Sequence, residues 1–87
     1  MKMGPEDEAV ISKIFAELRR AEVKFPGWPD DLVYGAAILA EEAGEVVKAA
    51  VDLFYGRGTR LDLVKEIAQT GAMAIRYLIY MSRKADS

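Results

Sequence analysis

Residues 30–56, DDLVYGAAILAEEAGEVVKAAVDLFYG, are rich in alanine, glutamate and leucine and contain no proline. These residue types are among the best helix formers, and they outweigh the few β-branched valines between them. Asp30 or Asp31 can cap the start of the helix with a carboxylate. The stretch therefore predicts one long helix of roughly 25 residues, about 37 Å at 1.5 Å per residue.

The flanking segments separate this helix from one further helix on each side. It should continue to Phe54 or Tyr55 and stop at the glycine that follows. Upstream, KFPGWP at residues 24–29 ends a first helix that we expect to run from about Pro5 to about Val23. Downstream, a turn containing two glycines precedes a third helix, expected from Arg60 to about Ser82.

The second and third helices carry apolar faces that are wide for so short a chain. On the second helix this face comprises Leu32, Ala36, Leu39, Ala43, Val46, Val47, Ala50 and Phe54. On the third helix it comprises Leu61, Val64, Ile67, Ala68, Gly71, Ala72, Ile75, Leu78 and Ile79. Three helices cannot bury two such faces within one small monomer. We therefore predict an all-α homo-oligomer, dimer or tetramer, with a four-helix core built from two chains.

Composition limits the possible functions. The chain has 87 residues, of which 52% are hydrophobic and 30% charged, and this suits one globular domain at residues 1–87. A net charge of −2 gives no broad attraction to a nucleic-acid backbone. The acidic N-terminus is unlike a signal peptide, and no apolar run approaches the ~20 residues of a membrane span. We expect a cytoplasmic protein that binds neither nucleic acid nor membrane.

Cysteine and histidine are both absent. Their absence excludes disulfides, thiolate metal sites, the Ser-His-Asp triad and the usual zinc sites. A metal ion would have to be bound by oxygen atoms, which favours hard ions. We therefore expect Mg²⁺, with Mn²⁺ as the alternative.

Acidic residues gather on one face of the long helix. At ~100° per residue, a narrow stripe comprises Tyr34, Ile38, Glu41, Glu45, Lys48 and Asp52, with Glu42 beside it. Glu41 and Glu45 are four residues apart, so their charges repel unless a cation lies between them. An antiparallel third helix would bring Glu66 to face this pair. Gly44, which costs ~1 kcal/mol relative to alanine in a helix, indicates a close approach by another helix or a ligand. A solvated face produces the same periodicity, so both interpretations stay open.

The two acidic segments together resemble a known family. ILAEEAGE at residues 38–45, followed by KEIAQ at residues 65–69, is similar to the MazG-like, all-α nucleoside triphosphate pyrophosphohydrolases. That family carries Glu-x-x-Glu on one helix and Glu-x-x-Asp on the next. The resemblance extends from about Trp28 to about Tyr80. It departs from the family at Gln69, which stands at the position of the family's aspartate.

The resemblance implies a magnesium site. Its ligands would be Glu41, Glu42, Glu45, Glu66 and Gln69. The Gln69 carbonyl can ligate a metal ion but carries no charge, so Asp52 or Asp62 could substitute for the family's aspartate. The implied reaction is hydrolysis of the α–β phosphoanhydride bond of a nucleoside triphosphate, giving a nucleoside monophosphate and pyrophosphate. Glu41 or Glu42 would orient the attacking water or take its proton.

The rest of the substrate needs basic and aromatic partners. The candidates for phosphate binding are Lys48, Arg57, Arg60 and Lys65, with Arg76 as an alternative. The candidates for stacking on the base are Trp28 and Tyr34, with Phe25 as a further one. Solvated charge and loop anchoring are the corresponding structural interpretations.

Three other functions fit the same residues. A phosphoribosyl-ATP pyrophosphohydrolase would use similar acids on the same helical frame. A non-catalytic helical module that binds metal and nucleotide would explain Gln69. A purely structural helical oligomer would explain the apolar faces alone.

Overall fold

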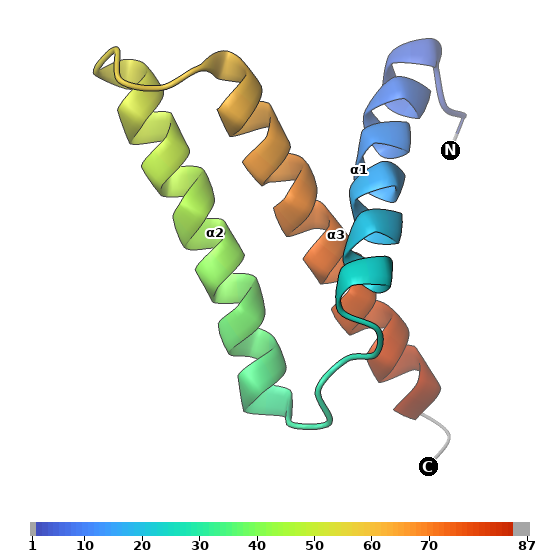
Figure 1. Cartoon of the computed structure of the whole chain (residues 1–87). Helices are drawn as coiled ribbons and strands as arrows, with labels where there is room; N and C mark the ends of the chain where they lie inside the picture. Colours follow the sequence, from blue (N-terminus) through green and yellow to red (C-terminus); the bar gives the residue numbers. More distant parts are fainter. Residues whose placement is uncertain (1, 85–87) are drawn as a thin grey trace.

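The computed structural model describes residues 2–84, which form three α-helices (Figure 1). They are α1 (Pro5–Lys24), α2 (Leu32–Phe54) and α3 (Arg60–Lys84). The described residues contain no strand. Each helix begins and ends within two residues of the predicted bounds, so the all-α prediction is confirmed. Between residues 2 and 84, none of the helices is long and apolar enough to cross a membrane.

Side-chain and backbone caps fix the ends of α2 and the start of α3. Of the two predicted caps for α2, Asp31 is the one used, and its carboxylate accepts from the N–H groups of Val33 and Tyr34 at 2.8 and 3.0 Å. Gly56 has a φ of 75°, and the helix closes with the Arg57 N–H on the Asp52 carbonyl at 2.7 Å. Thr59 Oγ1 accepts from the Asp62 N–H at 3.0 Å and caps the start of α3. These caps set a tight, antiparallel α2–α3 pair.

The central helix of the arrangement is α3, which packs against both α1 and α2. Within the described chain, α1 and α2 do not pack against each other, and they diverge from the loop that joins them (Figure 1). The α1–α3 contact is close at Gly71, where an added Cβ would stand 3.3 Å from Cδ1 of Ile14. The two outer helices are therefore separate walls on either side of α3.

A regular seam joins α2 to α3. The α2 residues of the seam recur at alternating intervals of four and three along the chain. They are Gly35, Leu39, Glu42, Val46, Ala49 and Leu53. All of these are buried or half-buried, whereas their neighbours Ala40 and Ala43 are exposed. The sequence placed Glu42 beside the acidic stripe, and the structure puts it on the seam. Glu42 thus places a carboxylate in a seam whose other α2 residues are apolar or glycine.

The buried core of the single chain is small. Among the described residues, the buried hydrophobic ones are Ala68 and Ala72, and the buried polar one is Arg76. The radius of gyration is 14.6 Å, against about 12 Å for a compact domain of this length. Large apolar side chains stay exposed on all three helices, among them Phe15, Phe54 and Leu78. One copy of the chain therefore buries little of its apolar surface.

The sequence suggested a close approach at Gly44, but within this chain the close approach is at Gly35. An added Cβ at Gly44 would have no atom within 4 Å, so nothing in this chain approaches it closely. At Gly35 an added Cβ would stand 2.9 Å from Nε1 of Trp28 and 3.1 Å from Cζ of Tyr77. The close approach lies at the start of α2, and its partners are the loop and α3.

Candidate active site

A cleft of about 580 Å³ lies between the C-terminal part of α1, the loop before α2, and the facing parts of α2 and α3. Its volume falls within the usual range for small-molecule sites. Its charged and aromatic lining residues are Glu17, Arg20, Lys24, Phe25, Trp28, Tyr34, Glu41, Glu42 and Arg76. Gln69 and Met73 complete the α3 side. The cleft thus combines carboxylates, cations, aromatic rings and an amide.

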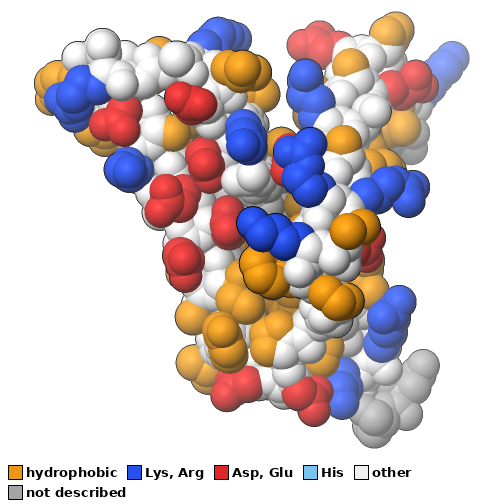
Figure 2. Space-filling view, viewed as in Figure 1, with side chains coloured by type: hydrophobic (Ala, Val, Ile, Leu, Met, Phe, Trp, Pro, Cys, Tyr) orange, Lys and Arg blue, Asp and Glu red, His pale blue; other side chains and the backbone are white. Residues whose placement is uncertain are grey.

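A smaller hollow of about 210 Å³ lies next to the α2–α3 turn, and we call it the turn hollow. The acidic stripe of α2 borders both spaces in chain order. Tyr34, Ile38 and Glu41 line the cleft, while Glu45, Lys48 and Asp52 line the turn hollow. Figure 2 shows the acidic side chains following α2 along this edge. The turn hollow receives Asp62, Lys65 and Glu66 from α3.

Glu42 is the electrostatic centre of the acidic residues. Partial burial raises the pKa of its carboxyl, and the negative charges of Glu66, Glu41 and Glu45 raise it further. Three of the four glutamates predicted from the sequence therefore act on the fourth, Glu42, and we call the four together the acidic cluster. Within residues 2–84, no group of three or more acidic side chains lies close enough to hold a metal ion. The cluster supplies oxygen donors of the kind that Mg²⁺ prefers, but within that range it does not bring three of them to one point.

The opposite end of the cleft is closed by Arg76, whose side chain is buried, with 7% of the residue exposed. Its Nη2 donates to the carbonyls of Phe25 and of Gly27, the latter at 2.6 Å. The guanidinium lies over the Trp28 ring, 5.3 Å from the centroid. Arg76, an alternative phosphate ligand by sequence, is thus engaged with the backbone of the loop.

Three further residues of α3 contact the same loop or the first residue of α2. The Tyr77 hydroxyl donates to the Leu32 carbonyl at 2.6 Å, and the Tyr80 hydroxyl donates to Oδ1 of Asp30 at 2.6 Å. Lys84 pairs with the same Asp30 oxygen at 3.1 Å. The hydrogen bond to Asp30 raises the pKa of Tyr80 to about 12 and lowers the pKa of Asp30. We call Arg76, Tyr77, Tyr80 and Lys84 the loop clamp.

The aromatic residues of the cleft differ in how much ring surface they offer. Trp28 packs against Tyr77 with ring centroids 5.5 Å apart, and it also lies against Arg76 and Gly35. Its buried indole N–H finds no acceptor among the described residues. Tyr34 and Phe25 line the same cleft and are exposed, Tyr34 to 60%. Tyr34 and Phe25 therefore present more ring surface to a ligand than Trp28 does.

The predicted site residues divide into three groups. Those that meet in the cleft are Trp28, Tyr34, Glu41, Glu42 and Gln69. Those that meet in the turn hollow are Glu45, Lys48, Lys65 and Glu66. Arg57 and Arg60 line neither space. Arg57 instead pairs with Asp52 at 3.4 Å and lies over the Tyr55 ring at 5.3 Å.

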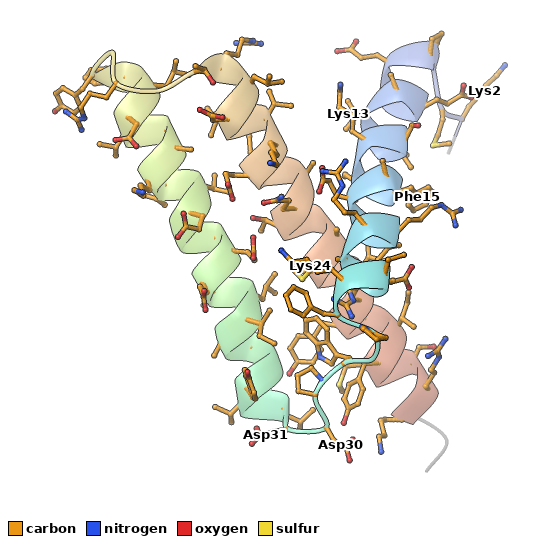
Figure 3. The ribbon with its side chains drawn as sticks, viewed as in Figure 1. Lys2, Lys13, Phe15, Lys24, Asp30 and Asp31 are labelled. Atoms are coloured by element: carbon orange, nitrogen blue, oxygen red, sulfur yellow. The ribbon has the colours of Figure 1, made fainter. Side chains whose placement is uncertain are left out.

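Sequence reasoning missed the contribution of α1. Glu17, Arg20 and Lys24 line the cleft, and Lys13 continues their stripe along the helix. Figure 3 shows Lys13 and Lys24 on the side of α1 that faces α2, with Phe15 on the opposite side. The charged residues recur at helical spacing opposite an apolar face, and this pattern was the available signal.

Comparison of the chain with protein-family models, with curated proteins and with solved structures gave no match.

Proposed function

We propose that this chain is a Mg²⁺-dependent nucleoside triphosphate pyrophosphohydrolase of the MazG-like kind. The observation that carries the proposal is the cleft. It gathers two glutamates and an amide with two aromatic residues, and together these come from the loop, α2 and α3. They are Glu41, Glu42, Gln69, Trp28 and Tyr34. A nucleotide needs an apolar slot for its base next to oxygen ligands for the metal ion of its phosphates. The cleft has both, and its volume suits a ligand of that size.

In this proposal, different residues of the site activate water, stack on the base and bind the metal ion. Glu41 or Glu42 orients a water molecule toward the α–β phosphoanhydride and accepts its proton as the water oxygen bonds to one phosphorus. The P–O bond of the anhydride bridge breaks at that phosphorus, and the bridging oxygen leaves with the other phosphate. Tyr34 and Phe25 stack on the base. The metal ligands would be Glu41, Glu42, Glu45, Glu66 and Gln69. Bound Mg²⁺ would supply charge neutralisation of the triphosphate. The products are a nucleoside monophosphate and pyrophosphate.

A second copy of the chain completes the proposal. A line of exposed positions runs along α2 on the side away from the acidic stripe, and it comprises Val33, Ala36, Ala40, Ala43, Val47, Ala50 and Phe54. Their steps of three and four are those of a helix-packing seam, and every side chain is apolar. The chain exposes 6664 Å², against about 5,100 Å² for a compact monomer of this mass. A four-helix core of two α2–α3 pairs would cover this line.

Light scattering tests the assembly. We expect the wild-type chain to have at least twice the monomer mass. Val47→Glu, which puts a charge in the middle of the exposed line, should shift the mass toward the monomer. Lys48→Glu introduces the same side chain one position away and serves as the control. A wild-type mass equal to that of the monomer at every concentration contradicts the assembly.

A nucleotide panel tests the activity. Purified protein with Mg²⁺ should release pyrophosphate from at least one nucleoside triphosphate, and phosphoribosyl-ATP belongs in the panel as the alternative substrate. Glu41→Gln, Glu42→Gln and Glu45→Ala should each lower kcat at least 100-fold while circular dichroism stays unchanged. Glu22→Gln, on exposed α1, is the matched control. Absence of turnover across the panel contradicts the proposal.

A non-catalytic module that binds metal and nucleotide is the second candidate, and Gln69 favours it. This residue lines the cleft where an acidic ligand would strengthen a magnesium site, and it carries no charge. Calorimetry that shows Mg²⁺-dependent nucleotide binding without product would select this candidate. Gln69→Asp should then tighten Mg²⁺ binding, because it adds a carboxylate to the same position.

A further inference from the structure

The cleft has two walls of opposite charge. On α1, two cations, Arg20 and Lys24, line it with one acid, Glu17, and on α2, two acids, Glu41 and Glu42, line it. Within residues 2–84, no ion pair joins the two walls. Figure 3 shows Lys24 directed from α1 toward the side where α2 lies, and Figure 2 shows basic side chains along this edge of α1. The opposite charges are therefore separated by the cleft itself.

Two contacts with α3 hold the walls apart. Ile14 packs on Gly71 and fixes α1, while the loop clamp fixes the start of α2 through Leu32 and the preceding loop. Because α1 and α2 do not pack on each other, the cleft stays open between them. A ligand that carries a cation on one side and anionic groups on the other would match both walls. A metal-chelated polyphosphate has this distribution of charge.

Arg20 and Lys24 are available for such a ligand. The Arg20 side chain is 64% exposed, whereas that of its ion-pair partner Glu17, at 3.3 Å, is 13% exposed. A guanidinium has five N–H donors, so the solvent-facing N–H groups of Arg20 can meet a phosphate while Nη1 keeps its pair with Glu17. Lys24 lies over the Phe25 ring at 5.4 Å, beside the aromatic part of the cleft. Arg76 differs, because the loop carbonyls already engage its Nη2.

The turn hollow is less suited to phosphate. Its lysines, Lys48 and Lys65, share it with four acidic residues, Glu45, Asp52, Asp62 and Glu66. An anion there would meet a net negative lining. In the cleft the three basic and three acidic lining residues balance, and α1 contributes the two cations Arg20 and Lys24 against one acid, Glu17. The cationic side of the cleft is therefore the better anion site.

We infer that Arg20 and Lys24 of α1 bind the phosphate groups of the ligand, facing the acidic residues Glu41 and Glu42 across the cleft. The inference rests on the proposed nucleotide site and assigns its phosphate contacts to a helix outside the acidic segments. A guanidinium can hold phosphate oxygens with two parallel hydrogen bonds, and a lysine adds a point charge.

Calorimetric titration of the full chain with inorganic tripolyphosphate in the presence of Mg²⁺ tests the inference without requiring turnover. The double variant Arg20→Gln/Lys24→Gln should weaken binding at least 10-fold. The control is Lys48→Gln/Lys65→Gln, which removes the same charge from the turn hollow and should change affinity less than 2-fold. Circular dichroism checks that both variants fold. In the nucleotide assay, the first variant should raise KM far more than it lowers kcat.

Each outcome decides between the assignments. Equal loss in the two double variants, greater loss in the turn-hollow variant, or no binding by the wild-type chain overturns the inference. Selective loss in the α1 variant, with no pyrophosphate released from any nucleotide, upholds the α1 phosphate site and overturns the hydrolytic function alone.

Discussion

The loop clamp and the acidic cluster lie at different levels of the same helix pair, α2 and α3. In the clamp, the guanidinium and hydroxyl donors of α3 meet oxygen acceptors of the loop or of the first turn of α2. In the cluster, Glu42 on the seam meets the negative charges of Glu66, Glu41 and Glu45. One region is a satisfied polar network, and the other surrounds a half-buried carboxylate with like charges, for which residues 2–84 show no ion pair.

The difference separates the residues that stabilise the fold from the residues that are available for function. Satisfied hydrogen bonds to a buried charge make a region rigid and stable. Like charges at a packed seam destabilise it, and proteins retain such arrangements mainly at functional sites. Under the proposed function, the clamp is the structural end of the cleft, and Glu41 and Glu42 of the cluster form its reactive end.

Removing the clamp's central cation should produce the largest effect. Arg76→Met takes the donor from the Phe25 and Gly27 carbonyls and removes the stacking on Trp28. Hydrogen bonds to a charged group contribute about 1.5–3 kcal/mol each, so we expect a loss of about 3 kcal/mol in the free energy of unfolding. Urea denaturation followed by Trp28 fluorescence measures it. Arg19→Met, at an exposed position on α1, should change stability by less than ~0.5 kcal/mol, and equal effects would contradict the role of the clamp.

Substitution of two glycines of α2 allows the two regions to be compared within one helix. Gly35→Ala forces a methyl group against Trp28 and Tyr77, and we expect a net loss of about 2 kcal/mol from overpacking. Gly44→Ala puts the same methyl group into open space and should gain up to ~1 kcal/mol from helix propensity. Thermal unfolding of both variants gives the comparison. Destabilisation by Gly44→Ala would mean that a second copy closes on the acidic segment.

Neutralising the seam carboxylate should stabilise the chain slightly. Burial and like charges raise the pKa of Glu42, so its ionised form opposes folding at neutral pH. Glu42→Gln should therefore gain about 0.5 kcal/mol at pH 7, and the gain should shrink as pH falls through the raised pKa, because wild-type Glu42 then becomes protonated. Urea denaturation at several pH values measures it. A gain that does not depend on pH would contradict the electrostatic cause.

The smallest effect belongs to the exposed edge of the clamp. Hydrogen bonding to Tyr80 and the pairing with Lys84 lower the pKa of Asp30, so its stabilising contribution is present above its ordinary pKa of 3.8 and is lost as pH falls through the lowered value. Asp30→Asn should lower the thermal midpoint only slightly at pH 7, because the group is exposed to solvent. The two proteins should converge in thermal stability at low pH, and a difference that widens on acidification would contradict this.

The helices could be predicted because their signals are local. Helix ends are marked through backbone or cap chemistry by Pro5, Asp31 and Gly56, and each does so in the structure. The acidic stripe could be predicted for the same reason, since helical spacing alone places its members in line. Its residues border the cleft and the turn hollow in that order.

Contacts between distant segments could not be predicted in the same way. Arg76 and the loop carbonyls are about fifty residues apart, and no local pattern links them. The position of Glu42 on the seam depends on which side of α2 meets α3, and hydrophobic spacing did not distinguish that side from its neighbours. The charges of α1 became relevant only when the tertiary arrangement placed Arg20 and Lys24 across from Glu41.

The loop clamp contacts mainly the main chain of residues 25–32, through the carbonyls of Phe25, Gly27 and Leu32. Carbonyl oxygens persist whatever side chain a residue carries. The side chain of Phe25, which lines the cleft, can therefore change while the hydrogen bond to its carbonyl is kept. Substitution at this position can alter ligand preference with the clamp intact, which makes it a convenient position for directed evolution.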